Sequence, residues 1–291
     1  MTAIQRVGMV GCGTMGSGIA HICAVAGLDV RVAASSQESL TRAEERVTKS
    51  LDRALAKDRL SAQEHETALR HLTYTTDLTD LADCHLVVEA VAEDLDAKLA
   101  LFARLDSVLA DRDTILATNT SSLSVTRLAR ATRDPSRVLG LHFFNPVPAL
   151  PLVELVGTLL TDEKTLTRAE EWVTVVLGKK PIRCEDRAGF TVNALLIPYL
   201  LSAVRMVESG YASPDAVDDA MTLGCSHPMG PLRLADLIGL DVVLSISESL
   251  YAESCDPNHS APPTLRRLVE AGLLGRKTGR GFHSYQQSGP R

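Results

Sequence analysis

A glycine-rich turn close to the N-terminus constrains the fold of this chain more than any other feature. Gly11, Gly13 and Gly16 lie between an apolar run at residues 6–10 and a helical pattern that ends at Gly27. A second apolar run follows directly, so the order is strand, glycine turn, helix and strand. This order predicts a βαβ unit, in which the glycines permit a tight turn and the helix N-terminus can bind a pyrophosphate.

Apolar runs continue to alternate with helical patterns over much of the chain. This alternation is typical of an α/β protein with a Rossmann-like, doubly wound and mostly parallel sheet. Further strands are expected at residues 85–88, 114–118, 138–143, 152–156 and 180–184. Residues 40–72 have the apolar spacing of two charged, amphipathic helices. We therefore expect a helical hairpin insertion, whose second helix is capped by Ser61 with Glu64 three residues on.

The pattern changes at Glu185, where the last expected strand has ended. Beyond it only helical patterns occur, and one of them runs without interruption over residues 232–251. A change from alternating to purely helical patterns indicates a domain boundary. We predict a dinucleotide-binding domain with a Rossmann-like fold at residues 1–185 and an all-helical domain at residues 186–291.

Composition and charge argue against several classes of protein. The formal net charge of −6 over 291 residues argues against nucleic acid as a partner. No apolar run approaches the ~20 residues that a membrane helix requires, so no membrane span is expected. The six cysteines have neither C-x-x-C spacing nor a paired histidine. We therefore expect no metal site, and reduced thiols in a cytoplasmic protein.

The glycine turn also bears on the choice of coenzyme. The residues of the turn expected to contact a dinucleotide are Gly11, Gly13, Thr14, Met15 and Gly16. An acidic residue that binds the ribose of NAD is expected about 20 residues further on, but Ala34 stands there. Ser35 and Ser36 can instead donate hydrogen bonds to a 2′-phosphate, with added charge from Arg31 or Arg42. The sequence thus favours NADP(H), or dual use of NAD(P), over an NAD site without its ribose contact.

Polar residues follow the ends of the third and fourth expected strands, where ligands bind in sheets of this kind. Glu93 follows the third strand and Lys98 lies on the next helix. We expect both near the coenzyme, the alternative being a surface ion pair. Asn119 and Ser121 follow the fourth strand. We expect Asn119 near the coenzyme and Ser121 on a substrate oxygen, whereas in the alternative this polar segment only caps the next helix.

His142 and Glu154 are the main catalytic candidates. His142 lies near the end of one apolar strand, and twelve residues later Glu154 stands in the middle of another. A buried carboxylate is costly unless a cation or strong donor meets it, and His142 is the obvious candidate. A histidine held by a buried glutamate can act as a general base near neutral pH. Asn193, a polar residue in an apolar helical stripe, either completes this site from the second domain or satisfies backbone groups in the core.

Together these motifs resemble those of the L-3-hydroxyacyl-CoA dehydrogenases, and most of all the bacterial 3-hydroxybutyryl-CoA dehydrogenases. The glycine turn, Asn-Thr-Ser-Ser at 119–122 and His-Phe-Phe-Asn-Pro-Val-Pro at 142–148 stand in the order and spacing of that family. Leu-Val-Glu at 152–154 and Gly-Phe-x-Val-Asn at 189–193 extend the match. The resemblance covers essentially the whole chain.

The resemblance implies a role for each candidate. His142 is the base that takes the proton of the substrate 3-hydroxyl group, and hydride passes between substrate C3 and the nicotinamide. Glu154 orients His142 and stabilises its charged form. Ser121 and Asn193 bind the substrate oxygen and the thioester region, and Asn145 is a further substrate contact.

The resemblance also implies how the substrate and a partner subunit bind. In this family a helical insertion covers the coenzyme A moiety of the acyl-CoA, and Lys57 and Arg59 in the insertion are placed to meet its phosphates. The family is typically a homodimer built through the helical domains. An acyl-CoA substrate and a homodimer are therefore expected.

The chain departs from the wording of the family at several positions. Ala34 replaces an acidic residue, Leu150-Pro151 replaces Met-Lys, and Ala194 replaces an arginine. These losses leave a hydroxyacyl thioester of acyl carrier protein (ACP) open as the substrate. The residues Pro-Leu-Val-Glu-Leu at 151–155 are also compatible with a dehydrogenase of a free hydroxy acid or sugar acid. A non-enzymatic alternative is an inactive nucleotide-binding structural or sensor protein, against which the complete set of catalytic candidates argues.

Overall fold

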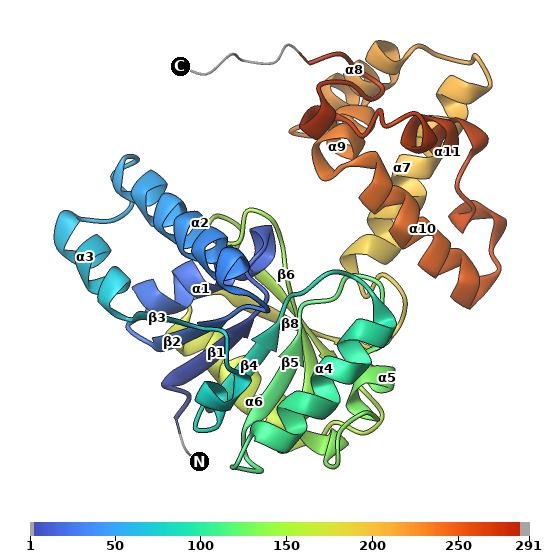
Figure 1. Cartoon of the computed structure of the whole chain (residues 1–291). Helices are drawn as coiled ribbons and strands as arrows, with labels where there is room; N and C mark the ends of the chain where they lie inside the picture. Colours follow the sequence, from blue (N-terminus) through green and yellow to red (C-terminus); the bar gives the residue numbers. More distant parts are fainter. Residues whose placement is uncertain (1–2, 286–291) are drawn as a thin grey trace. The chain divides into compact units, whose positions relative to one another are not determined.

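The chain divides into two compact units, Met1–Arg187 and Ala188–Arg291. The structure, a computed structural model, describes residues 3–285, and Figure 1 shows the course of the chain from blue at the N-terminus to red at the C-terminus. The first unit holds a β-sheet with helices around it, and the second unit is built from helices.

An eight-stranded sheet forms the centre of the first unit, in the order β3-β2-β1-β4-β5-β6-β7-β8. Neighbouring strands pair in parallel, except that β6 and β7 pair antiparallel. The strands are β1 Arg6–Val10, β2 Asp29–Ala33, β3 Leu72–Thr75, β4 Leu86–Glu89, β5 Ile115–Thr118, β6 Val138–Phe143, β7 Leu152–Gly157 and β8 Lys180–Glu185. The prediction of a mostly parallel, doubly wound sheet is confirmed.

Helices cover both faces of this sheet (Figure 1). They are α1 Thr14–Val25, α2 Gln37–Leu55, α3 Ala62–Arg70, α4 Leu95–Val108, α5 Val125–Ala129 and α6 Glu163–Glu171. Apolar side chains of α1, α2 and α6, among them Ile19, Val47 and Ala169, share one core with the strands. Because helices bury both of its faces, every residue of the central strands β4 and β5 is buried.

The helical insertion formed by α2 and α3 follows the sequence closely. The side chain of Ser61 accepts a hydrogen bond from Glu64 N, and the Glu64 carboxylate accepts one from Ser61 N at 2.8 Å. This is the capping box that the sequence predicts at the start of α3. Leu40, Val47 and Leu51 form the buried stripe of α2.

Two local expectations were wrong. Leu72 was expected to end a helix, but Leu72–Thr75 forms strand β3, parallel to β2 at the edge of the sheet. Four residues are too few for alternation to be recognised. The helix expected over residues 232–251 is two helices, α9 Pro231–Ile238 and α10 Leu240–Ser254, because Gly239 has a φ of 106° that no helix accommodates.

The second unit packs its helices around an apolar core of its own. Besides α9 and α10 it contains α7 Val192–Glu208, α8 Pro214–Cys225 and α11 Pro263–Glu270. The basic, glycine-rich segment near the C-terminus folds back on α9, where buried Asp236 accepts hydrogen bonds from Phe282 N at 3.0 Å and His283 N at 2.9 Å. Over residues 3–285, no helix is both long and apolar enough to cross a membrane.

Candidate active site

The carboxyl ends of β4, β5 and β6 lie beside one another because these strands are parallel neighbours. Glu89 pairs with Thr118 across β4 and β5, and Thr118 pairs with Gly140 across β5 and β6. The segments that leave these strands therefore meet at one edge of the sheet. The polar residues expected to bind ligands are brought to this edge by the topology alone.

A relay of three side chains lies at this edge. The Nδ1 atom of His142 is 2.7 Å from Oε2 of Glu154, and its Nε2 atom is 2.9 Å from Oγ of Ser121. His142 and Glu154 are register partners across the antiparallel strands β6 and β7, so the sheet itself sets their approach. The structure thus brings three of the four predicted catalytic residues together.

The relay is held in a largely dry environment. His142 is 4% exposed and Glu154 is 0% exposed, whereas Ser121 is half-buried on the loop after β5. The Phe144 ring packs edge-on against the imidazole, with 4.7 Å between ring centroids. A buried carboxylate at Nδ1 stabilises the imidazolium that a general base becomes when it accepts a proton. Glu154 also fixes the ring so that Nε2 faces Ser121.

The glycine turn has the geometry that a dinucleotide requires. Gly11 has a φ of 84°, and a Cβ atom on Gly16 would lie 2.0 Å from Gly11 O. A Cβ atom on Gly13 would meet nothing within 4 Å, so the backbone there is open to a ligand. Thr14 and Met15 begin α1, whose N-terminus lies at the turn. Close packing at Gly16 and free space at Gly13 fit a pyrophosphate bound at that helix end.

A cavity of about 730 Å³ opens beside this turn. Of the predicted coenzyme residues, Gly11, Gly13 and Ser35 line it, together with Arg42. Arg46 and Arg104 also line the cavity and were missed by the sequence analysis. Arg46 lies one helical turn beyond Arg42, a signal that was available, whereas Arg104 comes from α4 and no local pattern indicates it. The guanidinium groups of Arg42, Arg46 and Arg104 in the lining of the cavity suit an anionic ligand.

Two residues expected to meet a 2′-phosphate are engaged elsewhere. The side chain of Ser36 is the N-cap of α2 and accepts a hydrogen bond from Ser39 N at 3.2 Å. Arg31 forms an ion pair with Asp83 and lines a different hollow, beside β3. Arg31 therefore does not add its charge to the coenzyme cavity, because its guanidinium group is held beside β3 by Asp83.

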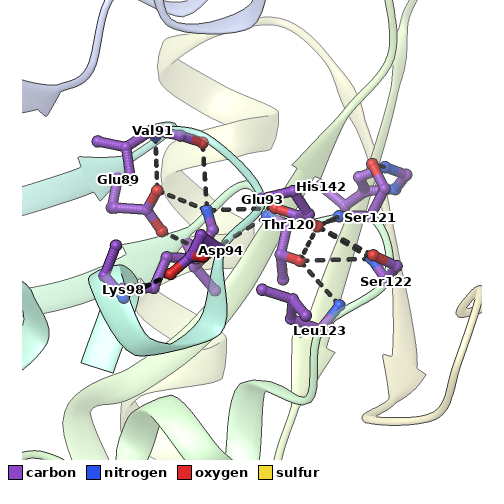
Figure 2. A network of polar contacts seen from close by, with 12 residues as sticks. Glu89, Val91, Glu93, Asp94, Lys98, Thr120, Ser121, Ser122, Leu123 and His142 are labelled. Atoms are coloured by element: carbon purple, nitrogen blue, oxygen red, sulfur yellow. Dashed lines mark hydrogen bonds and ion pairs between the residues drawn. The ribbon is translucent and has the colours of Figure 1, made fainter. Parts of the chain in front are cut away.

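Glu93 and Lys98 join Glu89 in a network of polar contacts that reaches Ser121 and His142 (Figure 2). The Nζ atom of Lys98 lies 2.6 Å from Glu89 Oε1 and 3.3 Å from Glu93 Oε2. Lys98 is 1% exposed and Glu89 is 0% exposed. The alternative of a surface ion pair is therefore wrong, because the lysine belongs to the interior.

Two residues of the segment after β5, Asn119 and Ser124, make hydrogen bonds that stabilise the fold. The side-chain oxygen of Asn119 accepts a hydrogen bond from Phe143 N at 2.9 Å, which links the ends of β5 and β6. Ser124 is the N-cap of α5. Capping is thus carried out by Ser124, and the hydroxyl group of Ser121 is left to contact His142. The predicted coenzyme contact of Asn119 stays a prediction.

Comparison with known families decides the identity of this arrangement. Residues 6–187 match the model described as "3-hydroxyacyl-CoA dehydrogenase, NAD binding domain", and residues 189–285 match the C-terminal domain of the same enzyme. The chain belongs to the 3-hydroxyacyl-CoA dehydrogenase family. The resemblance found in the sequence is confirmed, and the first unit of this dehydrogenase is an NAD(P)-binding domain.

Individual relatives match this dehydrogenase over nearly their whole length. A 3-hydroxybutyryl-CoA dehydrogenase of Mycobacterium tuberculosis is 55% identical over 97% of this chain and 99% of its own. A probable 3-hydroxybutyryl-CoA dehydrogenase of Deinococcus radiodurans is 44% identical over 97% of this chain and 100% of its own. The crystal structure of (S)-3-hydroxybutyryl-CoA dehydrogenase from Ralstonia eutropha has a TM-score of 0.93 at 42% identity, covering 98% of this chain and 100% of that structure.

The dehydrogenase has a second cavity, of about 610 Å³, between the helical insertion and the loop after β6. Lys57 and Arg59, the two predicted substrate contacts of the insertion, both line it. Arg53 and Lys179 also line it, so cations from separate elements surround this second cavity, which we call the basic groove. The Nζ atom of Lys179 donates to Val147 O at 2.8 Å, and burial lowers the pKa of this lysine.

The remaining predicted substrate residues lie in different surroundings. Asn145 is exposed on the loop after β6. Asn193 is 8% exposed on α7 of the second unit. The roles of Asn145 and Asn193 toward substrate stay predictions.

Proposed function

We propose that this protein interconverts an L-3-hydroxyacyl-CoA, of the 3-hydroxybutyryl-CoA type, and the corresponding 3-ketoacyl-CoA with NAD(P). The observation that carries the proposal is the Glu154–His142–Ser121 relay, with contacts of 2.7 and 2.9 Å, in a domain of this family. The relay provides a buried general base at the edge of the sheet from which the glycine turn also opens. The names of the relatives support the short-chain thioester.

Each member of the relay has a distinct task in the proposed reaction. In the oxidative direction His142 Nε2 accepts the proton of the 3-hydroxyl group as the C3–O bond becomes a carbonyl. Glu154 stabilises the resulting imidazolium, and Ser121 Oγ hydrogen-bonds the reacting oxygen together with Nε2. A coenzyme held at the glycine turn would supply the acceptor for the hydride of C3. Asn193 is proposed to hold the thioester, and Asn145 to be a further substrate contact.

The carrier of the acyl group is proposed to be coenzyme A and not ACP. The second cavity supports this choice, since Arg53, Lys57 and Arg59 line it. Such a groove suits the phosphates of the nucleotide part of coenzyme A, which acyl-ACP lacks. A free hydroxy acid or sugar acid would leave these cations without a ligand.

Initial rates test the function and the carrier together. We expect acetoacetyl-CoA to be reduced with a kcat/KM at least ~100-fold above that for acetoacetyl-ACP or free acetoacetate, because only the CoA ester fills the basic groove. Absence of turnover with all three substrates would contradict the proposed function. A preference for acetoacetyl-ACP would contradict the carrier alone.

Lys57 is the sharpest single test of the groove. Replacing Lys57 with alanine is expected to raise the KM for acetoacetyl-CoA about tenfold with kcat nearly unchanged, because an interaction made equally in ground and transition states is lost. Acetoacetyl-pantetheine, which lacks the nucleotide, should react with the same kcat/KM in wild type and in Lys57→Ala. The control is Lys49→Ala, an exposed lysine of α2 outside the cavity lining. A KM in Lys57→Ala equal to that of Lys49→Ala would refute the contact.

We further propose that the coenzyme is NADP(H), or that both coenzymes are used. Ala34, Ser35 and Arg42 line the coenzyme cavity, so a 2′-phosphate would meet no carboxylate at the end of β2. Ala34→Asp is expected to lower kcat/KM with NADPH at least ~10-fold, because the new carboxylate repels the phosphate. The same variant should keep or raise kcat/KM with NADH, which serves as the internal control. A wild-type enzyme that strongly prefers NADH would overturn the proposal.

A homodimer in the cytoplasm completes the proposal. All six cysteines are free thiols, which suits a reducing compartment. The second unit exposes large apolar side chains, with Leu195, Tyr211 and Leu223 at 74%, 80% and 84%. Such exposure supports a subunit interface on this unit.

A further inference from the structure

Three arginines line the coenzyme cavity, and only Arg42 is among the residues expected from the sequence. Arg42 and Arg46 come from α2, whereas Arg104 comes from α4. In the part of the chain that the structure describes, no aspartate or glutamate lines this cavity. The N-terminus of α1 already suits the pyrophosphate of either coenzyme. A positive lining without carboxylates therefore suits a ligand that carries a further anionic group.

The charge of Arg42 is offset by a neighbour on the same helix. Its guanidinium group forms an ion pair with Glu38, one turn earlier on α2, and donates to Ser39 Oγ at 3.1 Å. A phosphate that approached Arg42 would also approach the Glu38 carboxylate, which repels it. Arg42 is therefore a weak candidate for the main ligand of an additional phosphate.

Arg46 has a different set of contacts. Its Nη1 atom donates to the carbonyl oxygen of Cys12, in the glycine turn, at 3.3 Å, and within residues 3–285 it makes no ion pair. Burial raises the pKa of the Cys12 thiol to about 12, although Arg46 acts in the opposite direction, so this neighbour stays uncharged near neutral pH. A guanidinium group has five N–H donors, and most of those of Arg46 are left for a ligand.

The place of Arg46 in the fold matches the place of the group that distinguishes the two coenzymes. NADP(H) differs from NAD(H) by a phosphate on the 2′-oxygen of the adenosine ribose, and in folds of this kind that oxygen lies at the end of the second strand. Gly11 N donates to Ala33 O at 3.1 Å, so the glycine turn and the end of β2 are direct neighbours. Arg46, which contacts the next residue of the turn, borders the same cavity as Ala34 and Ser35.

We propose that Arg46 selects NADP(H) by pairing with its 2′-phosphate. The guanidinium group keeps its hydrogen bond to Cys12 O and donates its remaining N–H groups to the phosphate oxygens, a pairing for which its planar fork is suited. Ala34 leaves room for the phosphate and adds no negative charge. The inference rests on the proposed function, because it names the residue responsible for the proposed choice of coenzyme.

Arg104 provides an internal comparison, because it reaches the cavity from another wall. It stands on α4, and the cavity is also lined there by Leu101 and by residues 90–92 after β4. Strand β4 pairs with β1 on the side opposite to β2. This wall is therefore expected to face the part of the adenosine that both coenzymes share, and loss of Arg104 should weaken both to the same extent.

Fragments of the coenzymes test the contact without the reaction. Adenosine 2′,5′-bisphosphate carries the 2′-phosphate, and 5′-AMP is the same molecule without it. Isothermal titration calorimetry is expected to show that wild type binds the bisphosphate at least ~10-fold more tightly. Arg46→Gln should raise the Kd of the bisphosphate about 10- to 100-fold and change that of 5′-AMP less than about threefold. The glutamine amide can still donate to Cys12 O, so Tm should stay at the wild-type value.

Four further variants locate the effect. Arg46→Lys keeps the charge but not the planar fork, so its loss of affinity for the bisphosphate should be smaller than that of Arg46→Gln. Arg42→Gln should raise the same Kd less than about fivefold, because Glu38 already offsets its charge. Arg104→Gln should weaken both fragments by the same factor. Arg70→Gln removes an arginine of α3 outside the cavity lining and should change neither Kd.

Initial rates extend the test to the whole coenzymes. With acetoacetyl-CoA as substrate, Arg46→Gln should lower kcat/KM for NADPH by about the factor seen with the bisphosphate. The value of kcat/KM for NADH should stay within about threefold of wild type, because NADH has no 2′-phosphate to lose.

Three outcomes would overturn the proposal. Equal losses for both fragments in Arg46→Gln would show that Arg46 only supports the glycine turn. A larger loss confined to the bisphosphate in Arg42→Gln or Arg104→Gln would place the phosphate at that residue. Equal binding of both fragments by wild type would contradict the choice of NADP(H) together with the role of Arg46. Failure of the proposed function is distinct, since wild type would then reduce acetoacetyl-CoA with neither coenzyme.

Discussion

Replacing His142 with alanine is expected to lower kcat by about 10²- to 10⁴-fold while the affinity for coenzyme stays within about twofold of wild type. The imidazole is the group in the relay that is placed to take the proton of the 3-hydroxyl, and it is 2.7 Å from the carboxylate that stabilises its charged form. The glycine turn that is expected to bind the coenzyme lies between β1 and α1, and its conformation does not depend on His142. Steady-state rates with acetoacetyl-CoA and fluorescence titration with NADPH give the two quantities.

Alanine at position 142 also removes a hydrogen-bonding partner from the buried carboxylate of Glu154 and can therefore impair folding. A second variant separates loss of catalysis from loss of folding. His142→Gln keeps an amide that can reach Glu154 but cannot accept a proton, so it should fold like wild type and lose as much activity. The control is His71→Ala, since His71 lies near the surface beside Asp29 at 3.1 Å. Wild-type kcat in His142→Gln would rule out general-base catalysis by this residue.

Replacing Gly16 with alanine is expected to destabilise the first unit by about 3 kcal/mol and to weaken coenzyme binding at least ~10-fold. The added Cβ atom would lie 2.0 Å from Gly11 O, a backbone atom that cannot rotate away. The turn and α1 must therefore separate, which moves the helix N-terminus from the place where it meets a pyrophosphate. Urea denaturation and NADPH titration measure the two effects.

Two other glycines make the test specific. A Cβ atom on Gly13 would meet nothing within 4 Å, so Gly13→Ala should keep wild-type stability and lose only coenzyme affinity. A Cβ atom on Gly224, in α8 of the second unit, also meets nothing within 4 Å, and Gly224→Ala should change neither property. Equal stability of Gly16→Ala and Gly224→Ala would contradict the argument from packing.

Much of the fold was predictable because its signals are local. The glycine turn between two apolar runs defines a βαβ unit within about 30 residues. The capping box of Ser61 and Glu64 marks the start of α3 within four residues. Strand β3 was not predicted, because its four residues are too few to show alternation. The helix break at Gly239 was not predicted, because it depends on a backbone conformation that glycine permits but does not require.

The candidate site was predictable where burial itself left a trace in the sequence. His142 and Glu154 each interrupt an apolar strand, and a charge among apolar residues needs a partner. Arg104 left no such trace, because an arginine on an amphipathic helix is ordinary until the fold places it beside a cavity. Arg31 misled for the same reason, since its proximity in sequence to Ala34 does not show that its guanidinium group pairs with Asp83 beside β3.

The sequence by itself determined the reaction type, because a histidine and a glutamate in apolar strands and a glycine turn are local patterns with few physical explanations. Only the tertiary structure decided which charges act together. Lys98, Glu89 and Glu93 could equally have formed a surface cluster, and Lys57 and Arg59 could have lain outside any cavity. Local sequence patterns reflect the conformational preferences of residues that are close in sequence. Burial and long-range pairing depend instead on where parallel strands end and which helices cover them.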